Sequence, residues 1–214
     1  MWTAKNITAK PVEKYLYDLL PASDPVLREM ERVADREDIP IVGPVVGRML
    51  YLFAQLAGAK RVFEMGSAIG YSTIWLARAA GEGAEVHYSD GDPKKAQRAE
   101  RFIRRAGVGN WVQIHVGNSM DLLQDAPGEF DLIFIDVDKH QYPEAARLAM
   151  PRVRQGGLMI TDNTLWSGRA ARKANKNDRD TLGIQKFNRM VYAARDFFTI
   201  LVPLRDGVTV CRKV

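Results

Sequence analysis

The sequence predicts an α/β fold in which a mostly parallel β-sheet is covered by helices on both faces. Short apolar runs alternate with longer amphipathic stretches from about residue 60 onward. Several of the apolar runs end in a glycine or an acidic residue. This alternation is typical of right-handed βαβ units, which build parallel sheets with two covered faces.

The first part of the chain is expected to be helical. Residues 11–20 and 24–37 have polar outer faces, and residues 45–59 show helical spacing that stops near a glycine. The segment PIVGP, residues 40–44, separates the second and third of these helices, because proline and glycine interrupt regular structure.

Strands and helices then alternate along the rest of the chain. The expected strands are residues 60–66, 84–90, 112–118, 130–136 and 156–163. The expected helices are residues 71–81, 93–107 and 142–153, with a short helical turn at 119–125. The sequence contains no internal repeat and no interdomain linker, so we expect one domain spanning residues 1–214.

Bulk composition gives weaker constraints. The net charge of +5 permits a nucleic-acid partner without requiring one. No apolar stretch is long enough to span a bilayer, and the first residues do not resemble a signal peptide. The single cysteine, Cys211, fits a reducing cytoplasm and is interpreted as a small apolar residue in a late strand.

Acidic residues lie at or near the ends of four predicted strands, namely Glu64, Asp90, Asp136 and Asp162. Ligands of parallel α/β sheets bind at the carboxyl ends of the strands. The sequence therefore predicts a binding site built from these ends.

The segment FEMGSAIGYS, residues 63–72, is a strand, a glycine turn and a helix start. Ala68 replaces the second glycine of the dinucleotide fingerprint, which disfavours a dinucleotide oxidoreductase. Glu64 beside the turn favours a cationic ligand over a diphosphate, and Asp90 suits the hydroxyls of a ribose. These features favour S-adenosylmethionine as the ligand, although a structural turn with incidental acids remains an alternative.

Asp136, Asp162 and Asn163 offer three oxygen ligands at the ends of two strands. Such a set favours Mg²⁺, Mn²⁺ or Ca²⁺ over zinc. A metal ion there would acidify a substrate hydroxyl, and Lys139 could accept the proton if its pKa were lowered. Spacing alone leaves open a surface ion pair between Lys139 and Asp138, and a turn or helix cap at residues 162–163.

Other polar residues have simpler interpretations. His87 and His115 lie within strands and are expected to be structural, whereas His140 could line the pocket. The basic segment 167–180 is either a solvated loop or a nucleic-acid patch, and it lacks interleaved aromatic residues that could stack on bases.

The chain resembles the cation-dependent O-methyltransferases, the class of catechol and caffeoyl-CoA O-methyltransferases. The resemblance rests on FEMGSAIGYSTIWLA, YSDGDP, FDLIFIDVDKHQY, GGLMITDNTLWSGR and LRDGVTVCRK, and it runs from about Val42 to the last residue. It implies the Rossmann-like class I methyltransferase fold with a seven-stranded sheet.

The resemblance also implies roles by position. Asp136, Asp162 and Asn163 match metal ligands, Lys139 matches a general base that also contacts substrate, and Trp166 matches a residue at the substrate mouth. The positions that match contacts to S-adenosylmethionine are Val42, Glu64, Gly66, Ser67, Tyr71, Ser72, Asp90, Gly91, Ser119 and Asp138. Residues 1–40 correspond to a region that varies among relatives, contacts substrate and often forms a homodimer contact.

The sequence thus predicts metal-dependent methylation of a hydroxyl on a vicinal dihydroxy aromatic compound, with Asp136 and Lys139 as catalytic residues. Some bacterial relatives methylate a hydroxylated uridine in tRNA, and the basic segment 167–180 keeps that alternative open. A binding module that has kept only the fold is a third possibility, disfavoured because every expected ligand is present.

Overall fold

The computed structural model describes residues 7–22 and 24–214. Within this part of the chain, seven strands form one sheet in the order β3-β2-β1-β4-β5-β7-β6. The strands are β1 (Arg61–Met65), β2 (Glu85–Asp90), β3 (Val112–Val116), β4 (Phe130–Ile135), β5 (Val153–Thr161), β6 (Phe197–Val202) and β7 (Val208–Lys213). Strands β1 to β5 are parallel, and β7 runs antiparallel to both β5 and β6. The predicted mostly parallel seven-stranded α/β fold is confirmed.

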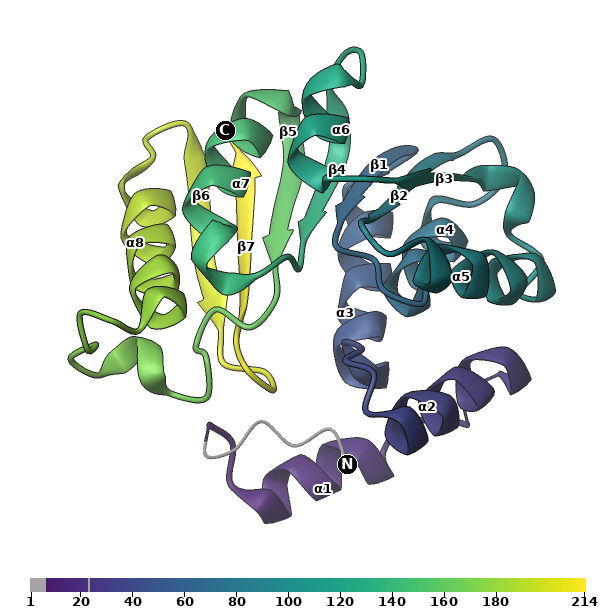
Figure 1. The fold of residues 1–214 in the computed structure, drawn as a ribbon, viewed down its shortest axis with the longest axis horizontal. Coiled ribbons are helices and arrows are strands. Elements are labelled where there is room, and N and C mark those ends of the chain that lie inside the picture. The colour runs from purple at the N-terminus through teal and green to yellow at the C-terminus, as the bar shows by residue number, and fades with distance from the viewer. Residues whose placement is uncertain (1–6, 23) are drawn as a thin grey trace.

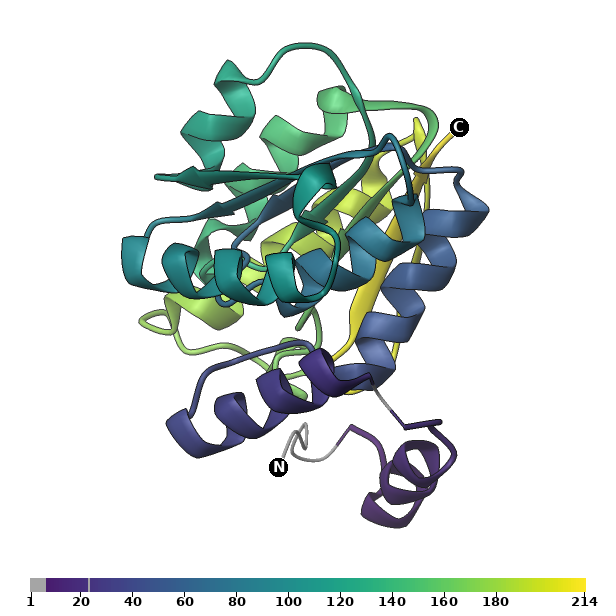
Figure 2. The ribbon, with the colours of Figure 1, turned by 90° about the vertical axis from the view of Figure 1, so that its right-hand side faces the viewer.

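Helices cover both faces of the sheet (Figures 1 and 2). The α-helices are α1 (Lys10–Asp18), α2 (Pro25–Glu37), α3 (Gly43–Leu56), α4 (Tyr71–Ala80), α5 (Pro93–Arg105), α6 (Ser119–Asp125), α7 (Tyr142–Ala149) and α8 (Arg179–Ala193). Helices α2 to α5 pack into one apolar cluster with the sheet, and α6 to α8 pack into a second cluster on the other face. None of the described helices combines the length and apolarity needed to cross a membrane.

Several helices begin where a side chain satisfies free backbone N–H groups. The Asp24 carboxylate accepts from the N–H groups of Val26 and Leu27 at 2.8 and 2.9 Å. Asp92 and Asn118 cap α5 and α6 in the same way. These caps replace hydrogen bonds that the first turn of a helix cannot make internally, so the short sequence signals fix where each helix starts.

The structure differs from the expected elements after residue 149. The predicted helix 142–153 ends at Ala149 and continues as a 3₁₀ turn, Met150–Arg152, before β5 begins at Val153. Pro151 lies in that turn, and proline cannot donate the hydrogen bond that would continue the helix. Helix α8 begins at Arg179, within the end of the segment 167–180, and the sequence patterns predict neither α8 nor strand β6.

The carboxyl ends of β1 and β4 approach each other closely at Gly66. This glycine has φ of +84°, and a Cβ atom there would lie 2.4 Å from the backbone oxygen of Asp136. The N–H of Asp136 donates to the carbonyl of Met65 at 2.8 Å, so the two strand ends are joined directly. Only glycine allows this approach, because any side chain would clash with the backbone of Asp136. The glycine turn and Asp136 therefore lie next to each other at the carboxyl ends of β1 and β4.

Candidate active site

A cleft of about 940 Å³ lies at the carboxyl ends of the parallel strands. The end of α2 and residues 38–41 form its other wall. Nine of the residues predicted for the site line this cleft: Gly66, Asp90, Gly91, Ser119, Asp136, Asp138, Lys139, Asp162 and Asn163. The structure therefore brings all three predicted metal ligands and five of the ten predicted cofactor contacts to a single cavity.

The other predicted residues, all within the part of the chain that the structure describes, are not among those that line the cleft: Val42, Glu64, Ser67, Tyr71, Ser72 and Trp166. The Tyr71 hydroxyl donates to Glu31 Oε1 at 2.6 Å, and Ser67 Oγ accepts from the N–H of Ser89 at 3.1 Å. Their predicted contacts with a cofactor or substrate stay predictions.

The Asp90 carboxylate is held in a defined orientation at the end of β2. Its Oδ2 accepts from the N–H of Ala68 at 2.9 Å, and its Oδ1 accepts from the N–H of Asp92 at 2.9 Å. The Tyr88 hydroxyl donates to the carbonyl of Ala68 at 2.6 Å. Ala68 has φ of +45°, so these bonds stabilise a left-handed turn that points the loop and the carboxylate toward the cleft.

Glu64 is completely buried in β1, behind the glycine turn. The Thr73 hydroxyl donates to its Oε2, while its Oε1 has no hydrogen-bond partner. Burial raises the pKa of Glu64 to about 7, although the nearby hydroxyl groups of Ser72, Thr73 and Ser67 act in the opposite direction. A buried carboxyl with one free oxygen is an uncommon arrangement, and functional sites are enriched in such groups.

Lys139 forms an ion pair with Asp136 and not with Asp138. Its Nζ lies 2.8 Å from Asp136 Oδ1 and also donates to the carbonyl of Val137 at 3.2 Å. The Lys139 side chain is only 13% exposed, so the alternative of a surface pair with Asp138 is wrong. Burial acts to lower the pKa of Lys139, but the charge of Asp136 outweighs it and raises the pKa above the usual value. The depressed pKa expected for a free base is therefore not present in this arrangement.

Asp162 and Asn163 follow β5, next to Asp136. Asp162 is 1% exposed, and its Oδ1 is buried without a hydrogen-bond partner. Burial and the nearby charge of Asp136 raise the pKa of Asp162 to about 7, partly offset by Arg205. Two neighbouring carboxylates with an unsatisfied oxygen fit a divalent cation, because such an ion would satisfy the oxygen and reduce the repulsion.

The third predicted ligand is an amide. In residues 7–22 and 24–214, no three His, Cys, Asp or Glu side chains gather into a group that could hold a metal ion. The predicted cation site therefore depends on Asn163, which has φ of +55°. The backbone carbonyl of Asn163 accepts from the N–H of Trp166 at 3.2 Å. The segment therefore forms a turn as well as facing the cleft.

Trp166 packs beside Lys139 at the edge of the site. Lys139 Nζ lies 5.9 Å from the centre of the indole ring, and the Arg169 guanidinium lies 4.5 Å from it. Cations over an indole face are attracted by the electron density of the ring. Trp166 thus links the predicted base to the start of the basic segment.

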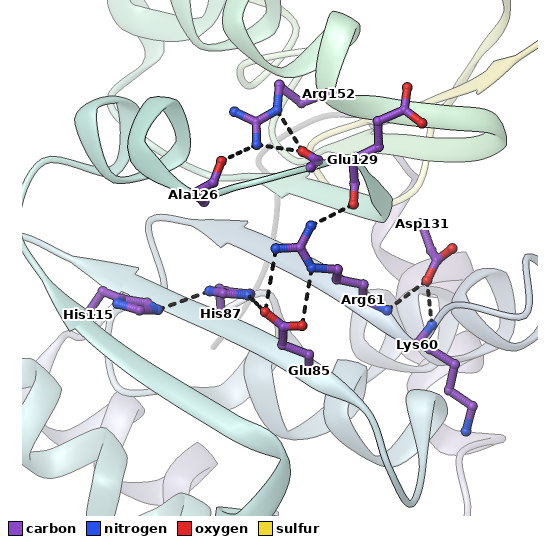
Figure 3. Close-up of polar contacts among 10 residues, drawn as sticks. Lys60, Arg61, Glu85, His87, His115, Ala126, Glu129, Asp131 and Arg152 are labelled. Carbon is purple, nitrogen blue, oxygen red and sulfur yellow. Dashed lines mark hydrogen bonds and ion pairs between the residues drawn. The ribbon is translucent and has the colours of Figure 1, made fainter.

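The histidines do not take part in the cleft. His87 and His115 lie side by side on β2 and β3, with 3.0 Å between Nδ1 and Nε2, and His87 Nε2 lies 2.6 Å from Glu85 Oε1 (Figure 3). His140 does not line the cleft, contrary to what its position in the sequence allowed; its Nδ1 lies 3.2 Å from Asp180 Oδ1.

Sequence reasoning missed one wall of the cleft. Asp35 and Asp38 at the end of α2, Asn118 after β3, and Arg205 between β6 and β7 also line it. The pattern of polar residues after apolar strands points to Asn118, but no local pattern places α2 or Arg205 there. With these residues, six aspartates and three basic side chains line the cleft. This excess of acidic side chains favours the binding of ligands that carry positive charge.

Comparison with known proteins places the chain in a family. The family model described as "O-methyltransferase" matches residues 21–214. A catechol O-methyltransferase of Niastella koreensis is 36% identical over 194 residues, covering 88% of this chain and 87% of that protein. A caffeoyl-CoA O-methyltransferase of Populus kitakamiensis is 29% identical and covers 99% of this chain and 97% of that protein.

Solved structures agree with these matches. The O-methyltransferase from Bacillus cereus, in complex with SAH, superposes with a TM-score of 0.86 and 30% identity, covering 95% of this chain and 97% of that chain. The chain therefore belongs to the O-methyltransferase family, and the predicted enzyme class, an S-adenosylmethionine-dependent O-methyltransferase, is confirmed.

Proposed function

We propose that the enzyme methylates one hydroxyl of a catechol-type aromatic compound, with S-adenosylmethionine as methyl donor and a divalent cation in the cleft. The observation that carries the proposal is the pair Asp136 and Asp162, whose carboxylates face one cleft while Asp162 Oδ1 lacks a partner. The names of the catechol and caffeoyl-CoA O-methyltransferases to which the chain is similar support the aromatic substrate.

Each side of the cleft then has a separate task. Asp90, held by the N–H groups of Ala68 and Asp92, accepts from the ribose hydroxyls of the donor. Gly66 leaves room for the donor beside the backbone of Asp136, and Asp138 attracts its positive charge. These residues hold the methyl group near the cation site, and such positioning supplies much of the rate of a transfer reaction.

Asp136, Asp162 and Asn163 would hold the cation, for which Mg²⁺ is the first candidate and Mn²⁺ or Ca²⁺ the alternatives. When bound, the cation supplies positive charge that favours loss of the proton from a phenolic hydroxyl. Lys139 lies beside Asp136, and this ion pair raises its pKa and keeps Nζ protonated. Nζ can accept the phenolic proton only after the ion pair has opened and Nζ has released its own proton to solvent. Trp166 offers an aromatic face next to Lys139 for the substrate ring.

The test is methyl transfer to a panel of catechols with Mg²⁺ and with a chelator. Product that forms with Mg²⁺ and disappears with chelator is the expected result. Product that persists undiminished with chelator would exclude the cation from the reaction, and binding of S-adenosylmethionine without product from any catechol would exclude the substrate class.

A second candidate is methylation of a hydroxylated uridine in tRNA. It is favoured by five basic side chains that are all exposed beside the site: Arg169, Arg172, Lys173, Lys176 and Arg179. Salt separates the two substrates, because phosphate contacts weaken steeply with ionic strength and contacts to a small catechol do not. Turnover of tRNA that falls steeply between 50 and about 200 mM salt would favour this candidate.

Three further expectations stay proposals. The single sheet that contains all described strands supports one domain over residues 1–214, and the buried thiol of Cys211 suits a cytoplasmic location. A homodimer through residues 1–40 is supported by the exposed apolar side chains of Val12 and Tyr15 on α1 and of Leu19 directly after it. Light scattering of the purified enzyme, and of a Leu19→Glu variant, would measure the mass; a monomer at micromolar concentration would exclude the dimer.

A further inference from the structure

The turn between β6 and β7, residues 204–207, is hydrogen-bonded to residues 41–42 at the cleft wall and to residues 165–167, which follow the cleft residue Asn163. On one side, Arg205 Nη1 donates to the carbonyl of Ile41 at 3.3 Å and to the carbonyl of Val42. On the other side, the N–H of Ser167 donates to Asp206 Oδ1, and the N–H of Leu165 donates to the carbonyl of Asp206 at 2.8 Å. Two neighbouring side chains of one turn thus join segments that are more than a hundred positions apart in the sequence.

These two segments border different parts of the cleft. Ile41 faces the cavity from the start of α3, the side of the predicted cofactor contact Val42. Ser167 follows Trp166, the residue predicted for the substrate mouth. The turn therefore connects the segment predicted to contact the cofactor with the segment predicted to border the substrate mouth.

Arg205 adopts a backbone conformation that disfavours it. Its φ is +50°, in the left-handed region where a residue with a side chain is strained and glycine is not. The turn has little freedom to relax, because Gly207 packs so closely that a Cβ atom there would lie 2.5 Å from Leu165 Cγ. Strain of this kind persists where the surrounding structure holds it, and it is concentrated at functional sites.

The Arg205 side chain gives a reason for keeping a strained residue. It lines the cleft and reaches two carbonyls at the start of α3, and a charged donor makes stronger hydrogen bonds to carbonyls than a neutral one. A glycine at this position would relieve the backbone but would lose both contacts. A side chain at this position is therefore explained by the contacts it makes across the cleft.

We propose that Arg205 is a positioning residue for methyl transfer: its guanidinium fixes the backbone of Ile41 and Val42 against the donor, while Asp206 fixes the substrate-side loop through Ser167. One turn then sets the width of the cleft on both sides. The inference rests on the proposed function, because it takes the cleft to be the binding site of S-adenosylmethionine.

The test compares three substitutions in the full-length enzyme, Arg205→Lys, Arg205→Ala and Arg205→Gly. Calorimetry measures the dissociation constant of S-adenosylhomocysteine, and steady-state kinetics measures KM and kcat. We expect Ala and Gly to raise the dissociation constant and the donor KM by about tenfold, since both lose a charged hydrogen-bond donor. Lys keeps a cationic donor and is expected to stay within about threefold of the wild type.

The Gly variant separates positioning from a merely conformational role. If Arg205 matters only for the shape of the turn, Gly adopts φ above zero freely and binds the ligand as tightly as the wild type, while Ala alone is impaired. That pattern, or wild-type affinity in all three variants, overturns the inference. Melting temperatures identify a variant that has lost its fold. If Arg205→Ala is lost, the comparison of Gly with Lys still distinguishes the two roles, and if Arg205→Gly is lost, wild-type affinity of Arg205→Ala overturns the inference.

Two controls complete the design. Arg189→Ala, on the exposed side of α8, removes the same charge away from the cleft and should leave the dissociation constant unchanged. Wild-type enzyme that fails to bind S-adenosylhomocysteine would overturn the proposed function itself. Wild-type enzyme that binds it, with Arg205→Gly binding equally well, would overturn only the role of Arg205.

Discussion

The hydroxyl of Tyr142 donates to the backbone carbonyl of Asp162 at 2.9 Å, which joins the first turn of α7 to the end of β5. The same hydroxyl lies 3.5 Å from Asp136 Oδ1, and Lys139 Nζ lies 5.1 Å from the centre of the tyrosine ring. Tyr142 is fully buried. One side chain therefore contacts both strand ends of the predicted cation site and the predicted base.

Replacing Tyr142 with phenylalanine tests this arrangement. We expect Tyr142→Phe to lower kcat about tenfold and to weaken Mn²⁺ binding, because the carbonyl of Asp162 loses a buried donor while the ring under Lys139 is retained. Calorimetric titration with Mn²⁺ measures the affinity independently of turnover. Tyr192→Phe is the matched control, since that tyrosine is 56% exposed and its hydroxyl only accepts from the N–H of Leu201. Equal effects of the two substitutions would contradict the prediction.

Replacing Asp162 with asparagine should change stability and activity in opposite directions. In the cation-free enzyme, Asp162→Asn removes a buried charge that repels Asp136, so the melting temperature should rise, with a gain on the order of 2 kcal/mol. Turnover should fall by about a hundredfold or more, because the cation loses a charged ligand. Differential scanning calorimetry with chelator and with Mg²⁺ measures both states. A variant that is less stable with chelator and still active would show that Asp162 has another role.

The buried carboxyl of Glu64 predicts a pH-dependent stability. Burial raises its pKa to about 7 in the folded protein, compared with 4.5 for the unfolded chain. Between these values the folded protein keeps a proton that the unfolded chain has lost, so stability falls as the pH rises through this window. Above pH 7 the loss from this one group is about 3 kcal/mol.

The substitution Glu64→Gln isolates that contribution. Glutamine resembles the protonated acid, so the melting temperature of the variant minus that of the wild type should increase between pH 5 and pH 8. Taking the difference at each pH removes the contributions of other titrating groups. A difference that stays constant over this range would mean that Glu64 does not titrate there.

Arg152 offers a stability prediction away from the cleft (Figure 3). Its guanidinium donates to the carbonyls of Leu123 at 2.7 Å, Gly128 at 2.6 and 2.9 Å, and Ala126. These carbonyls lie at the end of α6 and in the loop before β4, and the last carbonyls of a helix have no partner within the helix. Arg152→Ala should cost about 3 kcal/mol in urea denaturation and leave kcat unchanged at 25 °C. A loss of activity without a loss of stability would connect this loop to the reaction.

The sequence was most informative where the relevant contacts are local. The apolar runs before Glu64, Asp90, Asp136 and Asp162 predicted strands, and parallel strands necessarily bring their carboxyl ends to one edge. The spacing of Lys139 from two aspartates could not decide its partner, because a lysine side chain reaches either one. That choice depends on the buried ring of Tyr142 and on the direction in which the 3₁₀ turn after β4 leaves the sheet.

Features that depend on distant parts of the chain were not predictable in this way. Helix α2 reaches the cleft through tertiary contacts, among them packing against α5 and the hydrogen bond from Tyr71 of α4 to Glu31, and Arg205 reaches Ile41 across more than 160 positions. Strand β6 alternates weakly between buried and exposed residues, since it lies at the sheet edge, so its periodicity carried little signal.

The place of β7 in the sheet has a consequence for biosynthesis. β7 lies between β5 and β6, although it follows every other strand in chain order. While the ribosome is still adding residues before Val208, β5 is an open edge and the backbone beside Asp162 lacks a neighbour on that side. The cleft is therefore complete only after the hairpin of β6 and β7, which carries Arg205, has been added to the sheet. Translation products truncated before Val208 should be inactive and prone to association through the uncovered strand.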